Sequence, residues 1–266
     1  MNDLNHYFET NRQSWNKRTA IHKDSSFYGL KEFKEGKSSL NKIELEEIGD
    51  VKDKSLLHLQ CHFGMDTMSW SRLGAKCVGV DLSDEAIKLA REINHELQLD
   101  AEFINCNMYD LKRHLDKRFD IVFTSYGTIG WLPDLKKWAE MIGYYLKSGG
   151  IFYIVDFHPA LWMMNEDFQY VKYNYFNADV IIDETEGSYS DRNAPIKTTN
   201  YGWNHPFSEI LNNLIQQNLE IIHLNEFPYS PYNCFNNLEQ GKDGMWRIKN
   251  MNEKLPMLFS IKAIKQ

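Results

Sequence analysis

One stretch near the start of the chain, residues 55–83, constrains the fold more than any other. An apolar run that ends at Leu59 is typical of a buried strand, and a tight turn follows it up to Gly64. A helical segment and a second apolar run come next, and that run ends on Asp81. The order strand, loop, helix, strand and acid is typical of the first half of a nucleotide-binding βαβ unit. An acid about 20 residues beyond the loop is where such units bind ribose hydroxyl groups.

The rest of the chain alternates between short apolar runs and amphipathic segments. Helices are expected to begin at Ser83, Pro133 and Pro206, where a capping residue or a proline precedes apolar residues at helical spacing. This alternation predicts an α/β fold with a mostly parallel sheet and helices on both faces. The strands expected after the first two cover residues 101–106, 119–125, 151–157, 219–227 and 256–264.

Residues 55–83 also resemble the cofactor-binding start of class I S-adenosylmethionine-dependent methyltransferases. The similarity is to a branch of that family whose first loop reads LQCHFG followed by Asp-Thr, and the segments SYGTIGWLPDL and VDFHP fit the same branch. The general family pattern is an acid followed by three glycines at alternate positions, and here His58 stands at the acid. Gln60 and His62 stand at the first two glycines, while Gly64 is retained. Gly64 is therefore expected where the backbone bends sharply or approaches the cofactor.

The resemblance implies a Rossmann-like class I methyltransferase fold. It predicts a mostly parallel seven-stranded sheet whose last strand is antiparallel, with helices on both faces and an inserted cap. Alternating runs at residues 171–175 and 197–201 indicate a hairpin in that cap. We expect a single domain over residues 1–266, because no Pro-, Gly- or Ser-rich linker divides the chain. Its parts are a helical N-terminal flap (1–50), a cofactor-binding half (51–159), the cap (160–203) and a C-terminal helix and strand pair (204–266).

The cofactor implied by the resemblance is S-adenosylmethionine, and the product is S-adenosylhomocysteine. Asp81 is expected to accept hydrogen bonds from both ribose hydroxyl groups. Asn107 follows a strand at the position where the family contacts the adenine amino group, and a turn residue before a short helix is the alternative interpretation. The predicted cofactor contacts are His58, Gln60, Cys61, His62, Phe63, Gly64, Thr67, Asp81, Leu82, Ser83, Asn107, Met108, Tyr109, Ser125 and Tyr126.

Methyl transfer from a sulfonium is an in-line displacement, so it depends on positioning and needs no metal ion or covalent nucleophile. The acceptor is expected where Tyr126 and His158, the two candidate catalytic residues, follow the fourth and fifth strands. His158 is the candidate base, and a packed polar residue at a strand end is the alternative. His205 fits the start of a helix as well as a substrate contact. The predicted substrate contacts are Tyr7, Trp15, Trp203, His205, Glu226 and Tyr229.

The amino-acid composition and the net charge limit the kinds of molecule that the protein could bind. The net charge of −7 and the absence of a Lys/Arg cluster disfavour nucleic acid. No long apolar run indicates a membrane span, and residues 1–15 lack an apolar secretion core. Four scattered cysteines without metal-ligand spacing predict reduced thiols, no metal site and a cytoplasmic location. The many aromatic residues outside the strands favour a small-molecule pocket, and the sequence leaves the oligomeric state open.

Three other functions stay open beside a small-molecule methyltransferase. An NAD-dependent oxidoreductase would also use Asp81 for a ribose, but it needs a Gly-rich turn for the pyrophosphate, and CHFG is not such a turn. A non-catalytic relative that binds the cofactor would explain the missing glycines, although the loop matches an intact branch pattern. Nucleic-acid methylation fits the fold but not the charge, and no Asn-Pro-Pro-Tyr-like motif follows the fourth strand.

Overall fold

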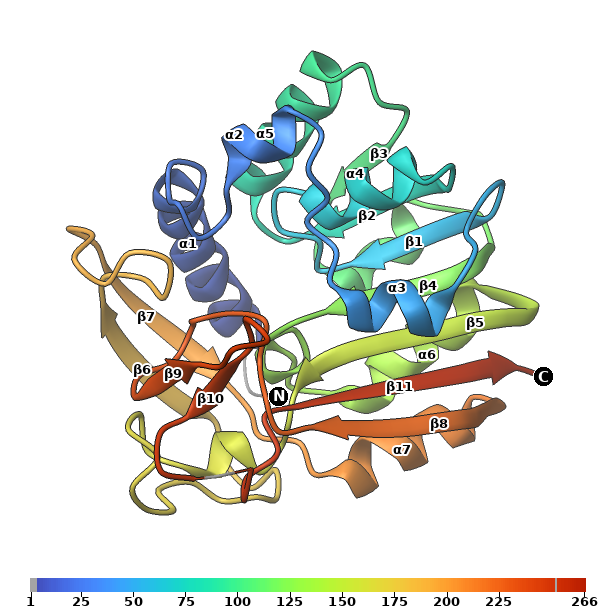
Figure 1. The fold of residues 1–266 in the computed structure, drawn as a ribbon. Coiled ribbons are helices and arrows are strands. Elements are labelled where there is room, and N and C mark those ends of the chain that lie inside the picture. Colours follow the sequence, from blue (N-terminus) through green and yellow to red (C-terminus); the bar gives the residue numbers. More distant parts are fainter. Residues whose placement is uncertain (1–3, 252) are drawn as a thin grey trace.

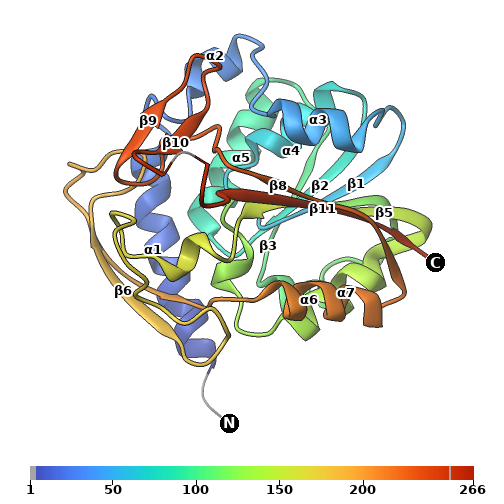
Figure 2. The ribbon, with the colours of Figure 1, turned by 60° about the horizontal axis from the view of Figure 1, so that its bottom comes forward.

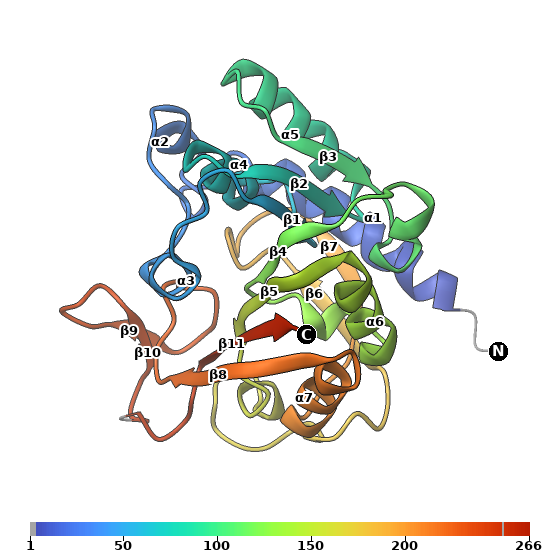
Figure 3. The same cartoon turned by 90° about the vertical axis from the view of Figure 1, so that its right-hand side faces the viewer.

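A seven-stranded sheet runs through the centre of the computed structural model, which describes residues 4–251 and 253–266. Its strands lie in the order β3-β2-β1-β4-β5-β11-β8, from top to bottom in Figure 3. They are β1 (Ser55–Leu59), β2 (Lys76–Asp81), β3 (Glu102–Asn105), β4 (Phe119–Ser125), β5 (Leu146–Phe157), β8 (Leu219–Phe227) and β11 (Leu258–Lys265). Strand β11 is antiparallel to both of its neighbours, and the other strands of this sheet are parallel to one another. The predicted sheet with an antiparallel last strand is confirmed.

Helices cover both faces of the sheet (Figure 2), as predicted. The helices form two buried apolar clusters with the strands, one on each face. This layering follows from right-handed crossover connections between parallel strands. The first face carries α3 (Lys42–Ile48), α4 (Met65–Arg72) and α5 (Asp84–Glu96), and the second carries the 3-10 helix η1 (Met108–Arg113), α6 (Leu135–Tyr145) and α7 (Phe207–Gln216).

Two of the predicted helix starts have side-chain caps. The Ser83 hydroxyl accepts a hydrogen bond from the backbone N–H of Ala86 at the start of α5, at 3.1 Å. The Asp134 carboxylate accepts one from the N–H of Lys137 at the start of α6, at 3.0 Å. Each cap satisfies an N–H group that the first helical turn leaves without a partner. These local signals fix where the crossover helices begin, and so where the preceding strands end.

The N-terminal helix α1 (Leu4–His22) lies beside a hairpin at the carboxyl ends of the parallel strands (Figure 1). The hairpin consists of β6 (Ile181–Glu186) and β7 (Lys197–Gly202). Asn11 of α1 pairs with the backbone of Tyr201 through two hydrogen bonds of 2.8 Å, one in each direction. Helix α1 and the hairpin therefore form one continuous layer over the end of the sheet.

The inserted segment differs in detail from the sequence expectation. The run at 197–201 forms most of β7, but the run at 171–175 forms no strand, and only Val171 makes an isolated bridge, to Met164. The partner of β7 is β6, whose sequence IIDETE shows little apolar alternation. A second small hairpin, β9 (Leu238–Gln240) with β10 (Trp246–Ile248), stands where the sequence indicates a loop. Strands of three residues are too short to show a period of two.

Short helices connect these layers. They are α2 (Leu30–Lys34), η2 (Ile129–Trp131) and η3 (Leu161–Met163). No helix in the described part of the chain is long and apolar enough to cross a membrane. The four cysteines are free thiols in the structure.

Candidate functional site

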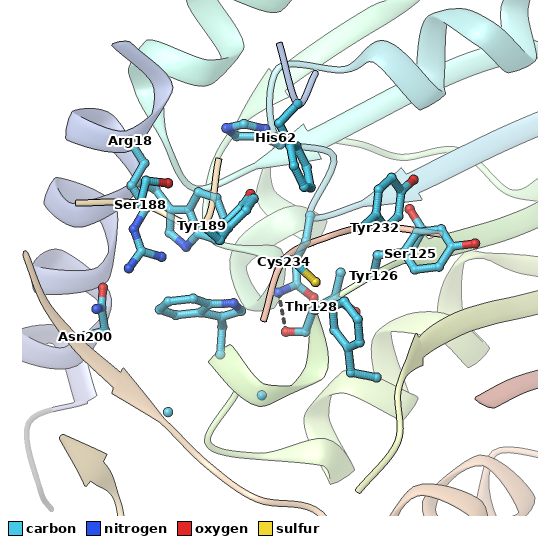
Figure 4. Close-up of a pocket in the computed structure, with 18 of the residues that line it drawn as sticks. Arg18, His62, Ser125, Tyr126, Thr128, Ser188, Tyr189, Asn200, Tyr232 and Cys234 are labelled. Carbon is cyan, nitrogen blue, oxygen red and sulfur yellow. Dashed lines mark hydrogen bonds between the residues drawn. The ribbon is translucent and has the colours of Figure 1, made fainter. Parts of the chain in front are cut away.

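A cavity of about 1200 Å³ opens at the carboxyl ends of the parallel strands. Its wall is built from α1, the loop after β1, the ends of β2 and β4, the hairpin β6–β7 and the segment before β9. Figure 4 shows Arg18, Ser188 and Asn200 on one side and Ser125 and Tyr126 on the other. The volume exceeds the range of roughly 300–1,000 Å³ that is common for one small ligand, so the cavity has room for two.

Most of the predicted cofactor residues share this wall. Three of them lie behind it: Thr67 binds His58, Ser83 caps α5, and Tyr109 packs against the ring of Phe8. The sequence places these three correctly on the elements that border the cavity, but their side chains contact protein rather than open space. The predicted residues in the wall are His58, Gln60, Cys61, His62, Phe63, Gly64, Asp81, Leu82, Asn107, Met108, Ser125 and Tyr126.

The loop after β1 keeps the backbone shape of a glycine-rich turn without its glycines. Gln60 and His62 have φ angles of 57° and 53°, in the left-handed region that glycine adopts most easily. For residues with a side chain this conformation costs about 1–2 kcal/mol each. The loop therefore keeps the backbone conformation of a glycine-rich turn although its residues differ from the general pattern.

Gly64 is a glycine because of packing as much as backbone freedom. Its φ is 75°, so the predicted sharp bend is present, and it forms the N-cap of α4. A Cβ atom at this position would lie 2.3 Å from the ring of Phe103 and 3.3 Å from the Cβ of Ala90. The loop thus packs directly on β3 and α5, which is the role of the third glycine in dinucleotide-binding turns.

Asp81 ends β2 with its carboxylate in the cavity wall. One carboxylate oxygen accepts a hydrogen bond from the N–H of His62 at 2.7 Å, and the other accepts one from the N–H of Ser83 at 2.8 Å. Each oxygen keeps a lone pair for a further donor, such as a hydroxyl group. Burial raises the pKa of Asp81 to about 6 against the effect of these backbone hydrogen bonds, so the carboxylate is ionised at neutral pH.

Two buried polar atoms in the floor of the cavity have no partner among the described residues: Nε2 of His58 and Oε1 of Gln60. His58 uses Nδ1 for a hydrogen bond with the Thr67 hydroxyl at 2.8 Å, and burial lowers its pKa to about 3, so the ring is neutral. Gln60 donates through Nε2 to the carbonyl of Thr128 at 2.9 Å. Buried polar atoms are normally paired, so these two atoms indicate that a polar ligand completes the site.

Asn107 has the turn role considered from sequence, and its contact with the adenine amino group stays a prediction. Its side-chain oxygen accepts a hydrogen bond from the N–H of Tyr109 at 3.1 Å and so caps η1. The residue also lines the cavity next to Met108 and Leu82. An apolar slot with an amide beside it suits a flat heteroaromatic ring.

Asp156 holds the loop after β4, and sequence reasoning missed it. Its carboxylate accepts hydrogen bonds from the N–H and hydroxyl of Thr128, at 2.9 and 2.7 Å, and from the N–H of Ile129 at 3.2 Å. It also accepts one from the N–H of Gly127. The sequence did carry a signal, because a charged residue inside the apolar run IFYIVDF needs a partner when it is buried.

One side of the cavity has the carboxyl group of Asp66 in its wall and that of Glu44 outside the wall, bonded to Tyr126, and the sequence analysis singled out neither. Asp66 accepts hydrogen bonds from the hydroxyls of Ser39, at 2.6 Å, and Ser125, at 3.2 Å, and burial raises its pKa. Glu44 accepts one from the hydroxyl of Tyr126 at 2.8 Å, and burial raises the pKa of Glu44 to about 7. The Tyr126 hydroxyl is thus engaged by protein, and burial raises its pKa, so it stays protonated at neutral pH.

The opposite side carries a cation and neutral imidazoles. Arg18 and Trp15 of α1 line the cavity together with Ser188 and Asn200 of the cap. His22 Nε2 pairs with the Ser188 hydroxyl at 2.7 Å, and burial and the charge of Arg18 lower the pKa of His22 to about 3. The guanidinium of Arg18 therefore lies across the cavity from Ser125, whose hydroxyl binds Asp66.

The sequence predicts that His158 is a base that faces the methyl acceptor, but the structure places its side chain elsewhere. It is buried outside the cavity wall, and its ring packs against Phe207 at 4.9 Å between centroids. Nδ1 accepts a hydrogen bond from the N–H of Ala160 at 3.0 Å, so Nε2 carries the proton and donates to Glu226 at 2.6 Å. Side chains alternate along a strand, so Phe157 faces the cavity and His158 faces α7.

Four of the six predicted substrate contacts also lie outside the cavity wall. Glu226 binds His158, and Tyr229 packs against Phe227. His205 pairs with the carbonyl of Leu132 at 2.8 Å, which is the helix-start role considered from sequence. Tyr7 packs behind the wall, against the rings of Tyr201 and Trp203. Trp15 and Trp203 do line the cavity.

No metal site accompanies this arrangement in the described residues. The structure brings no three His, Cys, Asp or Glu side chains together in a group that could hold a metal ion within residues 4–251 and 253–266.

The sheet order, the antiparallel β11 between β5 and β8 and a cavity at the strands' carboxyl ends define the fold of class I S-adenosylmethionine-dependent methyltransferases. Residues 57–154 match the family model of a methyltransferase domain. The solved structure of an S-adenosylmethionine-dependent methyltransferase from Clostridium acetobutylicum is similar over 95% of this chain and 99% of its own, with a TM-score of 0.59 and 16% identity. At that identity the likeness shows the fold.

Two curated relatives are similar in sequence. An uncharacterized methyltransferase of Synechocystis sp. is 30% identical over 130 residues, which cover 48% of this chain and 59% of that protein. A ubiquinone biosynthesis O-methyltransferase of Nitrosomonas europaea is 28% identical over 111 residues, which cover 42% of this chain and 46% of that protein. The chain thus spans about half the length of the curated relatives it matches.

Proposed function

We propose that this protein transfers the methyl group of S-adenosylmethionine to a small organic acceptor. The main support for the proposal is that the loop after β1 and the carboxylate of Asp81 lie together in the cavity wall. The loop takes glycine-like backbone angles at Gln60 and His62, and Asp81 presents free lone pairs at the end of β2. Both features lie in a class I methyltransferase fold, in the wall of one cavity.

The residues present fit this cofactor. Asp81 would accept the ribose hydroxyls, and Asn107 with Met108 would border the adenine. The unpaired Oε1 of Gln60 and Nε2 of His58 would face its polar methionine part. When bound, the cofactor supplies an electrophilic methyl group on a sulfonium. The protein holds, orients and encloses the cofactor and the acceptor. Alignment of this kind lowers a reaction barrier by up to about 7–11 kcal/mol.

The acceptor in this proposal is a small molecule in the cavity rather than a polymer. Helix α1 and the hairpin cover the end of the sheet, and Trp131, Trp203 and Phe235 line the space beneath them. Rings around an enclosed space suit an organic body that a few polar groups orient. The net charge of −7 argues against nucleic acid, and the Nitrosomonas relative bears the name of a small-molecule O-methyltransferase. The proposal includes a cytoplasmic location, in keeping with four free cysteines.

A general base is not part of this proposal. His158 faces α7, and the Tyr126 hydroxyl is held by Glu44. An acceptor that is already nucleophilic at working pH needs no proton removal, so positioning suffices for such a substrate.

Calorimetry tests the cofactor assignment directly. S-Adenosylhomocysteine should bind the wild-type protein, and Asp81→Ala should weaken that binding by at least about tenfold, because a charged hydrogen bond is worth about 1.5–3 kcal/mol. Asp116→Ala, an exposed acid distant from the cavity wall, is the control and should bind normally. Equal affinity of Asp81→Ala and wild type would remove the assignment, and selective binding of NAD would replace it with a nicotinamide-dependent activity.

A further inference from the structure

Arg18 is a buried cation without a counterion among the described residues. Its side chain reaches the cavity from α1, and the residue is only 6% exposed. The guanidinium donates one long hydrogen bond, 3.5 Å from Nη2 to the Thr198 hydroxyl, and its buried Nε has no partner among the described residues. The charge of Asp183 on β6 acts on Arg18 without forming an ion pair. Burying a charge without a partner is costly, so such a residue normally has a bound counter-ion.

The surroundings fix the position of Arg18 without neutralising it. Its guanidinium carbon lies 5.4 Å from the ring centroid of Trp15 and 5.6 Å from that of Trp131. The centroids of these two rings are 5.3 Å apart, so both rings lie on the same side of the guanidinium, and neither ring is an anionic partner for its N–H groups. Figure 4 shows Arg18 near Ser188 and Asn200, across the cavity from Ser125 and Tyr126.

Apart from Asp183, the polar side chains near Arg18 described below are neutral. Burial and the charge of Arg18 lower the pKa values of His22 and His62, so both imidazoles are uncharged at neutral pH. Ser188 and Tyr189 offer hydroxyl groups, and the Tyr189 phenol stays protonated because burial raises its pKa to about 12. Arg18 therefore lies beside neutral hydrogen-bonding groups, and a guanidinium with nearby hydroxyl donors is the chemistry that recognises an anion.

We propose that Arg18 receives an anionic oxygen group, a carboxylate or a phosphate, of a ligand bound in the cavity. The proposal rests on the proposed function for the identity of that ligand. Two sources offer the same chemistry: the carboxylate of the cofactor's methionine part, and an acidic group on the methyl acceptor. If the acceptor is the source, the protein methylates organic acids or phosphates, and Arg18 sets that specificity.

The test compares Arg18→Gln, which removes the charge, with Arg18→Lys, which keeps it, and with Arg113→Gln on an exposed surface as the control. Calorimetry measures S-adenosylhomocysteine and 5′-methylthioadenosine, which lacks the amino-acid part. If the cofactor's carboxylate binds Arg18, the Gln variant loses at least about tenfold in affinity for the first compound and none for the second.

The second arm uses thermal shifts with benzoate, benzamide and inorganic phosphate, with and without saturating S-adenosylhomocysteine. If an acceptor's anion binds Arg18, benzoate or phosphate stabilises the wild type and neutral benzamide does not. The Gln variant then loses this shift, while the Lys variant and Arg113→Gln retain it. Because the anion arm also runs without S-adenosylhomocysteine, failure of the cofactor to bind would count against the proposed function alone.

If Arg18 has only a structural role, Arg18→Gln should differ from wild type in melting temperature and not in its response to ligands. Removing an unpaired buried charge should leave the melting temperature of the empty protein unchanged or raise it by a few degrees. If Arg18→Gln instead melts earlier and keeps wild-type responses to every ligand in both arms, the proposal is overturned.

Discussion

Two loops leave neighbouring strands at the cavity, and a carboxylate from an adjacent strand holds each of them. Asp81 on β2 accepts a hydrogen bond from the N–H of His62 in the loop after β1. Asp156 on β5 accepts hydrogen bonds from the N–H groups of Thr128 and Ile129 in the loop after β4. Each loop also has a side-chain-bearing residue at positive φ, so each needs an anchor to hold its shape.

The two carboxylates differ in what remains after the loop is held. Asp81 is half-buried in the cavity wall and keeps a lone pair on each oxygen. Asp156 is 1% exposed, and its hydrogen bonds all go to protein groups. The same residue type at the same edge of the sheet thus serves a ligand in one case and the fold in the other. The number of protein donors around each carboxylate separates the two roles.

The largest expected effect is on stability, at the buried member of the pair. Asp156→Ala leaves the N–H groups of Gly127, Thr128 and Ile129 without their acceptor, and each such group costs about 1–3 kcal/mol when buried. Urea denaturation should show a loss of roughly 3 kcal/mol or more in the free energy of unfolding. Asp81→Ala should lose clearly less. Equal losses would erase the distinction between the two carboxylates.

The second prediction compares one glycine from each loop. A Cβ at Gly64 would lie 2.3 Å from the Phe103 ring, whereas one at Gly127 would lie 3.5 Å from the Phe157 ring, an ordinary contact. Gly64→Ala should therefore cost about 2–4 kcal/mol of unfolding free energy, the sum of overpacking and backbone strain. Gly127→Ala carries the strain alone and should cost about 1–2 kcal/mol. The same denaturation series ranks them, and a reversed order would contradict the packing argument.

The third prediction concerns how ligand affinity depends on pH, and it tests Asp81 without Asp156. The pKa of Asp81 is raised to about 6, and the ionised form is the better hydrogen-bond acceptor. Affinity for S-adenosylhomocysteine should thus be full above pH about 7 and fall as the pH drops through about 6, approaching tenfold per pH unit. Calorimetry at several pH values measures this slope. Asp81→Asn cannot titrate, so a slope that persists in that variant would locate the titrating group elsewhere.

The smallest effect is expected in the backbone of the loop after β1. Gln60 has a φ of 57°, so alanine at this position keeps the strain and glycine relieves it. Both substitutions lose the same hydrogen bond to the Thr128 carbonyl, which cancels in the comparison. Gln60→Gly should be more stable than Gln60→Ala by about 1 kcal/mol, the reverse of the usual order. Alanine above glycine in chemical denaturation would mean that the loop relaxes to a different turn.

Much of the fold was predictable because its signals are local. The caps at Ser83 and Asp134 and the apolar runs of the sheet strands place most of the elements correctly. The hairpin strand β6 and the pair β9–β10 lack such signals, because one is polar and the others have three residues each. Their pairing depends on contacts distant in sequence, which no window of residues contains.

The candidate site was predictable where it depends on position along one strand and loop, and not where it depends on which way a side chain points. The sequence located Asp81 and the loop after β1, and the structure places both in one cavity wall. It did not separate Phe157 from His158, since a shift of one residue decides which faces the cavity. It also gave no sign of Arg18, because the absence of a counterion is a property of the folded surroundings.

The layer formed by α1 and the hairpin affects how fast ligands can enter and leave the cavity. Both flank the cavity, and the paired hydrogen bonds between Asn11 and Tyr201 join them. We expect opening of that seam to ease the entry and exit of ligands, and lid motions of this kind take microseconds to milliseconds. Weakening the seam by replacing Asn11 would then shorten the residence of any ligand bound in the cavity.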